Sequence, residues 1–244
     1  MSDARLIVEV LPEPGETVRV AGGEAAHARA RRLAAGRAVV LVDGSGREAA
    51  ATVVRVLRGG LEVRVVSVVE AASDPFPPIH LLIAAVRPER LHWIVEKAAE
   101  LGAATVTIVA SEHTQAFRAR EGLVERLTRI VRESAKQSRA PRFTAIRGPI
   151  GFDEALAAEA PTRIVLDPSG EAFPDRIANA PAALLVGPEG GFTAAERAAA
   201  RDAGWLAAAL PAGVVRAETA AIAAIVLARA AALRSWTRAP LDSR

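Results

Sequence analysis

The sequence contains no cysteine, which excludes a disulfide-stapled fold, a cysteine-ligated zinc site and a thiol nucleophile. Long apolar runs are also missing, because no stretch of about 18 uncharged apolar residues exists. The longest candidate, Thr219–Ala228, ends at Arg229. The first ten residues, MSDARLIVEV, have an acid early and no long apolar run, so we do not expect a signal peptide. These absences predict a cytoplasmic protein that does not cross a membrane.

Tyrosine is absent, and lysine occurs only at positions 97 and 136, so nearly all basic residues are arginine. The net charge is only +3, yet the isoelectric point is near 10.3. The arginine excess has two interpretations, which net charge does not separate. It reflects a GC-rich genome, or it indicates an RNA partner, since guanidinium groups bind phosphates and stack on bases. The scarcity of aromatic residues argues that base stacking is not the main contact.

A chain of 244 residues forms one large domain or two ordinary ones. Residues 1–70 read mostly as short strands, with a turn at 43–46 between two β-branched runs and one helical piece at 24–33. This pattern favours a small β-barrel. The proline-rich stretch EAASDPFPPIH then suits a stiff connector. The boundary predicts two domains, at residues 1–72 and 78–244.

Strands and helices alternate in the second domain, which is typical of an α/β fold with a mostly parallel sheet. Buried runs such as IHLLIAAV and AALLVG predict strands, and apolar residues at helical spacing predict the helices between them. The expected strands are 79–86, 104–110, 162–167, 182–187 and 205–210, and the expected helices are 91–101, 123–131, 193–203 and 217–236.

The stretch LLVGPEGGFTAAE begins as a buried strand and ends as a helix. Ligands of open parallel sheets bind at the carboxyl ends of strands. Glycines at such an end let the backbone approach a ligand or adopt positive φ. Thr193 and Glu196 fit a helix capping box. Neither a dinucleotide fingerprint nor a Walker loop is present, and Glu189 would repel a pyrophosphate. The stretch therefore favours a cationic or phosphate-free ligand, and a tight turn without ligand is the alternative.

A second motif, LPAGVVRAETAAIAAI, follows about twenty residues later and joins another strand to a long helix. Taken alone, Glu218 can simply complement the dipole of that helix, and Arg216 can be its solvated partner. Together, the two motifs resemble those of the RsmE family, small-subunit ribosomal RNA uridine-N3 methyltransferases of the SPOUT class. The stretches HARARR with VDGSG, RPERLHWIVEKAAELGAATVTIVASEHT and ESAKQSRAP are similar to the same family, so the resemblance covers nearly the whole chain.

The resemblance implies an α/β knotted SPOUT methyltransferase domain at 78–244, with a deep trefoil knot and a mostly parallel sheet. A PUA-like β-barrel that binds RNA precedes it at 1–72. The resemblance further implies S-adenosylmethionine as cofactor, 16S rRNA in the small ribosomal subunit as partner, a homodimer and no metal. The activated sulfonium agrees with the last point, since methyl transfer from it needs no metal.

The resemblance also assigns site residues. Arg216 is expected to stabilise the uracil anion, and Glu218 is the weaker candidate for the base. The expected RNA-binding residues are Arg29, Arg32, Arg87 and Arg90. The expected cofactor-binding residues are Leu166, Val186, Gly187, Glu189, Gly190, Gly191, Leu210, Val215 and Thr219.

Several positions depart from the family pattern, among them Gly213, His113, Arg31 at a usually apolar position, and the missing glycine after Ser138. Gly213 stands where the family usually has arginine, and His113 where it often has arginine. The missing arginine beside the cofactor loop keeps two alternatives open. One is an RNA-binding or ribosome-assembly factor with impaired catalysis, and the other is a SPOUT enzyme that modifies a different RNA base.

Overall fold

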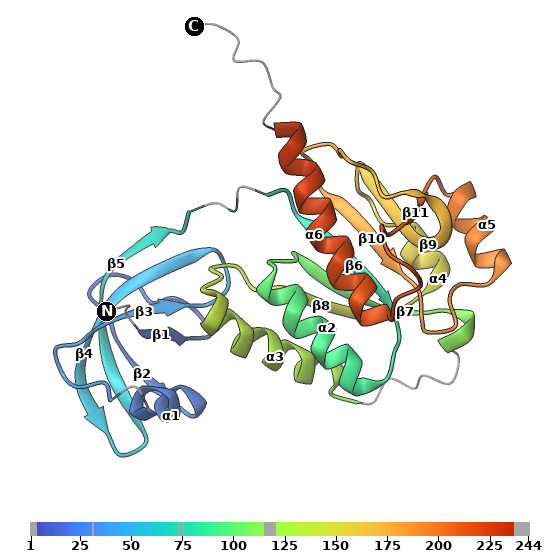
Figure 1. The fold of residues 1–244 in the computed structure, drawn as a ribbon. Coiled ribbons are helices and arrows are strands. Elements are labelled where there is room, and N and C mark those ends of the chain that lie inside the picture. The colour runs from blue at the N-terminus through green and yellow to red at the C-terminus, as the bar shows by residue number, and fades with distance from the viewer. Residues whose placement is uncertain (1–3, 31, 73, 75, 115–120, 237–244) are drawn as a thin grey trace, which may run out of the picture. The chain divides into compact units, whose positions relative to one another are not determined.

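The computed structural model of the protein describes residues 4–30, 32–72, 74, 76–114 and 121–236 (Figure 1). The chain divides into two compact units. The first unit comprises residues 1–73 together with 132–143, and the second comprises 74–131 and 144–244.

The first unit contains a five-stranded sheet in the order β1-β3-β4-β5-β2. Strands β1 and β3 run parallel, and the other pairs are antiparallel. Leu6, Leu41 and Leu61 are fully buried in a core cluster that also includes Ala28 of helix α1. The elements are β1 (Ala4–Ile7), β2 (Thr17–Ala21), α1 (Gly23–Ala30), β3 (Ala38–Val42), β4 (Arg47–Leu57) and β5 (Gly60–Glu70). The strand-rich first domain, helix α1 and the β3–β4 hairpin are as expected, and the PUA-like assignment stays a prediction.

Residues 132–143 belong to the first unit, although the sequence analysis placed them in the second domain. They contain the end of helix α3 (Leu123–Ser138) and the segment that follows. The Lys136 ammonium is buried and pairs with the Glu24 carboxylate of α1. The Phe143 N–H donates to the Gly44 carbonyl at 3.2 Å. These contacts join residues far apart in the sequence, which is why local patterns did not reveal them.

The second unit contains a six-stranded sheet in the order β11-β9-β10-β6-β7-β8, and every neighbouring pair in it is parallel. This confirms the prediction of an α/β unit with a mostly parallel sheet. The strands are β6 (Ile79–Ala84), β7 (Thr105–Ala110), β8 (Ala145–Gly151), β9 (Thr162–Ala172), β10 (Ala182–Val186) and β11 (Leu206–Ala209). The helices are α2 (Pro88–Glu100), the short η1 (Glu112–Thr114), α4 (Phe152–Leu156), α5 (Ala194–Asp202) and α6 (Ala217–Trp236).

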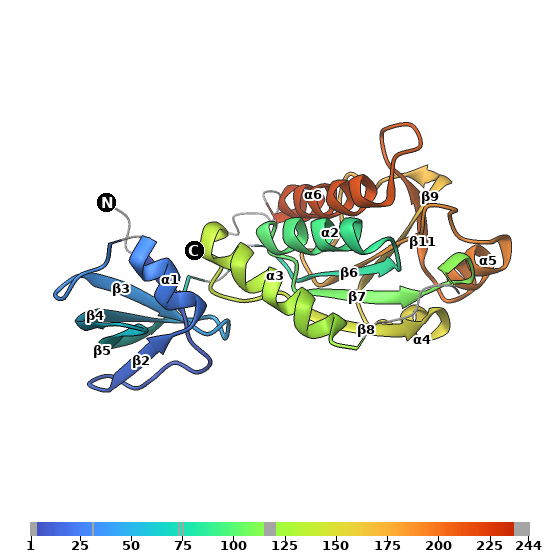
Figure 2. The same ribbon diagram turned by 90° about the horizontal axis from the view of Figure 1, so that it is seen from below.

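Helices cover both faces of this sheet, which explains its continuous apolar strands. Helices α2 and α6 pack together on one face (Figure 2). On the other face, Leu82 and Leu185 pack with Leu156 of α4 and Ala200 of α5. All residues of β10 are buried as a result. None of the helices in the described ranges is long and apolar enough to span a membrane.

Strand β8 and helix α4 were missed by the sequence analysis. Residues of β8 alternate between exposed and half-buried, and the strand contains Gly148 and Pro149. It lies at the edge of the sheet, where proline is tolerated and continuous burial is not required. An edge strand of this kind lacks the apolar run that identified the central strands.

Candidate cofactor and catalytic site

A cavity of about 760 Å³ lies at the carboxyl ends of β10 and β11, beside an irregularity in β9. The pairing of β9 with β11 jumps from Val165 to Glu171, so the intervening residues bulge out of the sheet. The volume is typical of sites for small molecules. Both sequence motifs line this cavity. The predicted cofactor positions that line it are Leu166, Val186, Gly187, Glu189, Gly190, Gly191, Leu210 and Val215.

Thr219 does not line the cavity, although it was predicted to bind cofactor. Ala217 and Ala220 of α6 do line it. Thr219 is two residues from Ala217, so helical geometry turns its side chain to the other side of α6. Of the predicted catalytic residues, Arg216 lines the cavity. Glu218 does not line it, but it forms ion pairs with Arg90 and Arg216, which do.

The glycines of the first motif have two structural roles in the protein itself, and the positive φ of Gly191 is one of the roles expected. Only Gly191 has positive φ, at 68°. A Cβ on Gly190 would lie 3.2 Å from Nδ1 of His113, and a Cβ on Gly187 would lie 3.2 Å from the ring of Phe192. Gly187 and Gly190 therefore allow the loop to pack tightly against protein side chains, and the approach of a ligand to them stays a prediction.

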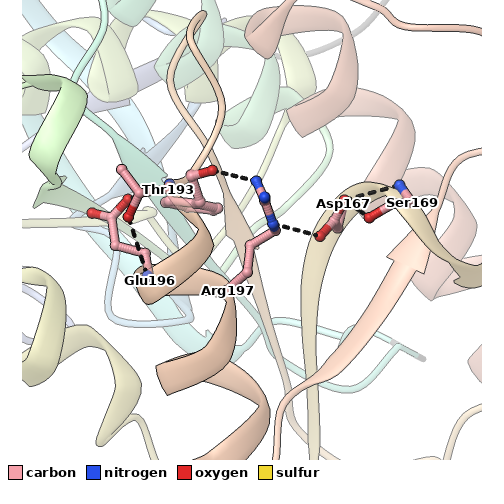
Figure 3. Close-up of polar contacts among 6 residues, drawn as sticks. Asp167, Ser169, Thr193, Glu196 and Arg197 are labelled. Atoms are coloured by element: carbon pink, nitrogen blue, oxygen red, sulfur yellow. Dashed lines mark hydrogen bonds and ion pairs between the residues drawn. The ribbon is translucent and has the colours of Figure 1, made fainter.

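The predicted capping box at the start of α5 is confirmed (Figure 3). The Glu196 N–H donates to Oγ1 of Thr193 at 3.2 Å, and the Thr193 N–H donates to Oε2 of Glu196 at 2.9 Å. The other Glu196 oxygen accepts from the N–H of Glu112 at 2.8 Å. His113 Nδ1 donates to the Gly191 carbonyl at 2.8 Å. One buried carboxylate therefore connects the glycine loop, α5 and η1.

Two arginines and two glutamates form a network at the cavity. Arg90 pairs with Glu189 and lies with its Nε 3.7 Å from Oε1 of Glu218. Nη1 of Arg216 lies 4.0 Å from the same Glu218 oxygen. The Arg216 side chain is 74% exposed, whereas that of Glu218 is 16% exposed. Oε2 of Glu218 is buried and has no hydrogen-bond partner among the described residues.

A further polar cluster at the cavity was not predicted (Figure 3). The buried Asp167 carboxylate accepts from the N–H and the hydroxyl of Ser169, at 2.9 and 2.7 Å. Arg197 of α5 lies 3.6 Å from Asp167 and donates to the Phe192 carbonyl. Arg197 therefore connects the β9 bulge to the glycine loop. The sequence signal was Asp-Pro-Ser-Gly directly after a buried strand, a pattern that favours a turn stabilised by its aspartate.

The predicted RNA-binding residues fall in different places. Arg87 is exposed at the N-cap of α2, and Arg32 is exposed after α1 with a φ of 52°. Arg29 lies in α1, and its side chain is outside the described part of the chain. Arg90 lines the cavity and pairs with carboxylates. Across the described ranges, no group of three or more His, Asp or Glu side chains is placed to hold a metal ion.

Comparisons with known proteins define the class. Residues 73–229 match the model of the RNA methyltransferase domain family. The Ribosomal RNA small subunit methyltransferase E of Mycobacterium bovis is 35% identical over 234 residues, which cover 89% of this chain and 88% of the relative. The chain therefore belongs to the RsmE family of RNA methyltransferases.

Solved structures agree with this membership. A protein of Legionella pneumophila, solved in complex with the bound cofactor SAM, is 27% identical with a TM-score of 0.82, over 93% of this chain and 97% of that one. The Ribosomal RNA small subunit methyltransferase E of Neisseria gonorrhoeae, also bound to S-adenosyl methionine, has a TM-score of 0.84 at 24% identity, over 92% of this chain and 96% of that one. The Neisseria structure supports the fold alone.

Proposed function

We propose that this protein is an S-adenosylmethionine-dependent methyltransferase that modifies N3 of a uridine in the 16S rRNA of the small ribosomal subunit. The observation that carries the proposal is a cavity lined by both signature loops, with Arg216 beside it. The relatives named ribosomal RNA small subunit methyltransferase E support the RNA substrate. The SAM-bound relative from Legionella supports the cofactor.

The residues of the cavity fit this cofactor. Its apolar walls, from Leu166, Val186 and Leu210, suit an adenosine. Its arginines Arg90 and Arg197 are ion-paired with carboxylates, so they do not form a free cluster that would select a phosphate ligand. S-adenosylmethionine carries no phosphate and, when bound, supplies a methyl group already activated by the sulfonium.

The residues of the chain then act on the target base. Uracil N3 must lose its proton, to solvent or to Glu218 as the weaker candidate for the base, before it accepts a methyl group, and a nearby cation stabilises the resulting anion. Arg216 is suited to this role because its guanidinium lines the cavity and is largely exposed. Glu218 restrains Arg216 only weakly, at the outer limit of an ion pair.

Mass spectrometry of rRNA nucleosides from cells with and without the gene tests the reaction. We expect 3-methyluridine in 16S rRNA to disappear when the gene is deleted and to return with a plasmid copy. An unchanged 3-methyluridine content would remove the proposed function, and loss of a different methylated nucleoside would replace the target base.

The finer features of fold and assembly belong to the same proposal. They are a deep trefoil knot in the second unit, a PUA-like barrel that presents RNA, a homodimer and a cytoplasmic location. Trp93 of α2 and Val226 of α6 support the dimer, because both are large, apolar and more than 40% exposed on neighbouring helices. Light scattering at micromolar protein is expected to give a dimer mass, and a monomer mass would refute the assembly.

A further inference from the structure

Arg90 connects the two signature motifs through ion pairs with an acid of each. It lies in the first turn of α2, and its side chain is 27% exposed. It pairs with Glu189 of the glycine loop and approaches Oε1 of Glu218 at the start of α6. Glu189 is 99 residues away in sequence. Arg90 was expected to bind RNA, and its ion pairs are with the acids of the candidate active site.

The position of Arg90 affects Arg216 through their shared partner. Oε1 of Glu218 lies 3.7 Å from Arg90 and 4.0 Å from Arg216, so the carboxylate is divided between two cations. Because Arg90 compensates part of its charge, Glu218 holds Arg216 only loosely. Without Arg90, Glu218 would lose this compensating charge, and Arg216 would be drawn into a closer pair with Glu218.

We propose that Arg90 is a positioning residue of methyl transfer, which acts through Glu218 to keep the Arg216 guanidinium available to the target base. This rests on the proposed function. Glu189 fixes the other side of the Arg90 guanidinium, so the cofactor loop and the catalytic arginine are joined through two carboxylates. The planar fork of arginine suits contact with two acids at once, and a lysine in its place would act as a point charge.

Single-turnover methylation of small ribosomal subunits tests the proposal. We expect Arg90→Ala to lower the rate at saturating RNA by up to about a hundredfold, the loss that a misplacement near 1 Å can cause. Arg90→Lys should recover part of the rate. In a protein that already carries Glu218→Gln, Arg90→Ala should lower the rate little further, because the side chain through which Arg90 acts has lost its charge. Lys97→Ala is the matched control, since Lys97 lies in the last turn of the same helix and pairs with Glu96 and Glu100.

Two binding measurements distinguish a positioning role from direct binding of cofactor or RNA. Titration of S-adenosylmethionine should show that Arg90→Ala still binds the cofactor, which also demonstrates a folded cavity. The slope of log affinity for RNA against log salt concentration should equal that of the wild type. A slope reduced by about one, with an unchanged rate at saturating RNA, would make Arg90 a phosphate contact and overturn the inference.

The kinetic outcomes are also distinct. Equal rates for Arg90→Ala and wild type would overturn the inference and leave the proposed function standing. Full additivity of Arg90→Ala and Glu218→Gln would show that Arg90 does not act through Glu218. A wild-type protein that transfers no methyl group to the subunit would refute the proposed function and the inference with it.

Discussion

Glu196, in the first turn of α5 directly after the glycine loop, is expected to be sensitive to substitution, because its buried carboxylate accepts two backbone N–H groups. They belong to Thr193 and Glu112, and only 8% of Glu196 is exposed. Replacing Glu196 by alanine leaves both N–H groups without an acceptor. Each unsatisfied buried group costs about 1–3 kcal/mol. Because both lie near the surface, we take the lower end for each, giving about 2 kcal/mol in the free energy of unfolding.

Two matched variants make this magnitude testable. Thr193→Ala removes only the hydroxyl that accepts from the Glu196 N–H, so it should cost about 1 kcal/mol. Glu196→Gln keeps the side-chain volume and one acceptor oxygen. Its loss in the free energy of unfolding should fall between those of Glu196→Ala and Thr193→Ala. In thermal unfolding, Glu196→Ala should lower the melting temperature by about 2–4 °C per kcal/mol.

The same change should also weaken cofactor binding. Glu196 connects η1 to the start of α5, directly after the glycine loop, so its loss removes a restraint on the wall of the cavity. Calorimetric titration of S-adenosylmethionine should show a larger loss of affinity for Glu196→Ala than for Thr193→Ala. A Glu196→Ala protein no less stable than Thr193→Ala would refute the reasoning, because the contact with Glu112 would then contribute nothing.

Three further predictions follow from single residues. Arg216→Ala should slow methyl transfer by orders of magnitude with nearly unchanged cofactor affinity, whereas Arg32→Ala should weaken RNA binding and flatten its salt dependence at an unchanged saturated rate; single-turnover kinetics at several salt concentrations would contradict this if Arg216→Ala lost RNA affinity alone. Gly191→Ala should destabilise by about 1 kcal/mol because of its positive φ, while Gly190→Ala should disturb the contact with His113 instead, and denaturant titration with cofactor binding separates the two. Burial, together with nearby Arg147, lowers the pKa of His80 in the folded protein. The contribution of neutral His80 to stability should therefore be fully present above the pKa of the unfolded chain, about 6.5, and should be lost as the pH falls from there towards the lowered folded pKa. Melting temperatures that do not change across that interval would contradict this prediction.

The central part of the second unit was predictable because its strands are buried on both faces. Runs such as AALLV in β10 reflect that burial directly, and the capping box was readable from Thr193 and Glu196 alone. The two signature loops also met in one cavity, as strands that end at the same edge of a parallel sheet require.

Features that depend on long-range pairing were not predictable. The ion pair of Arg90 with Glu189 and the link from Asp167 through Arg197 to Phe192 join separate elements of the second unit. The family resemblance assigned both Arg90 and the exposed Arg87 to RNA binding, and nothing local in the sequence distinguishes the two. Pairing of this kind is set by the sheet order, which no short motif contains.

Because residues 132–143 belong to the first unit, this unit is assembled from two separate parts of the chain. Its N-terminal sheet is translated first, yet the lysine that neutralises Glu24 of α1 leaves the ribosome more than a hundred residues later. A fragment ending at residue 72 would leave Glu24 without that partner and Gly44 without its hydrogen bond from Phe143. The first unit is thus contiguous in space but not in the sequence, and its contacts are complete only when the middle of the chain is present.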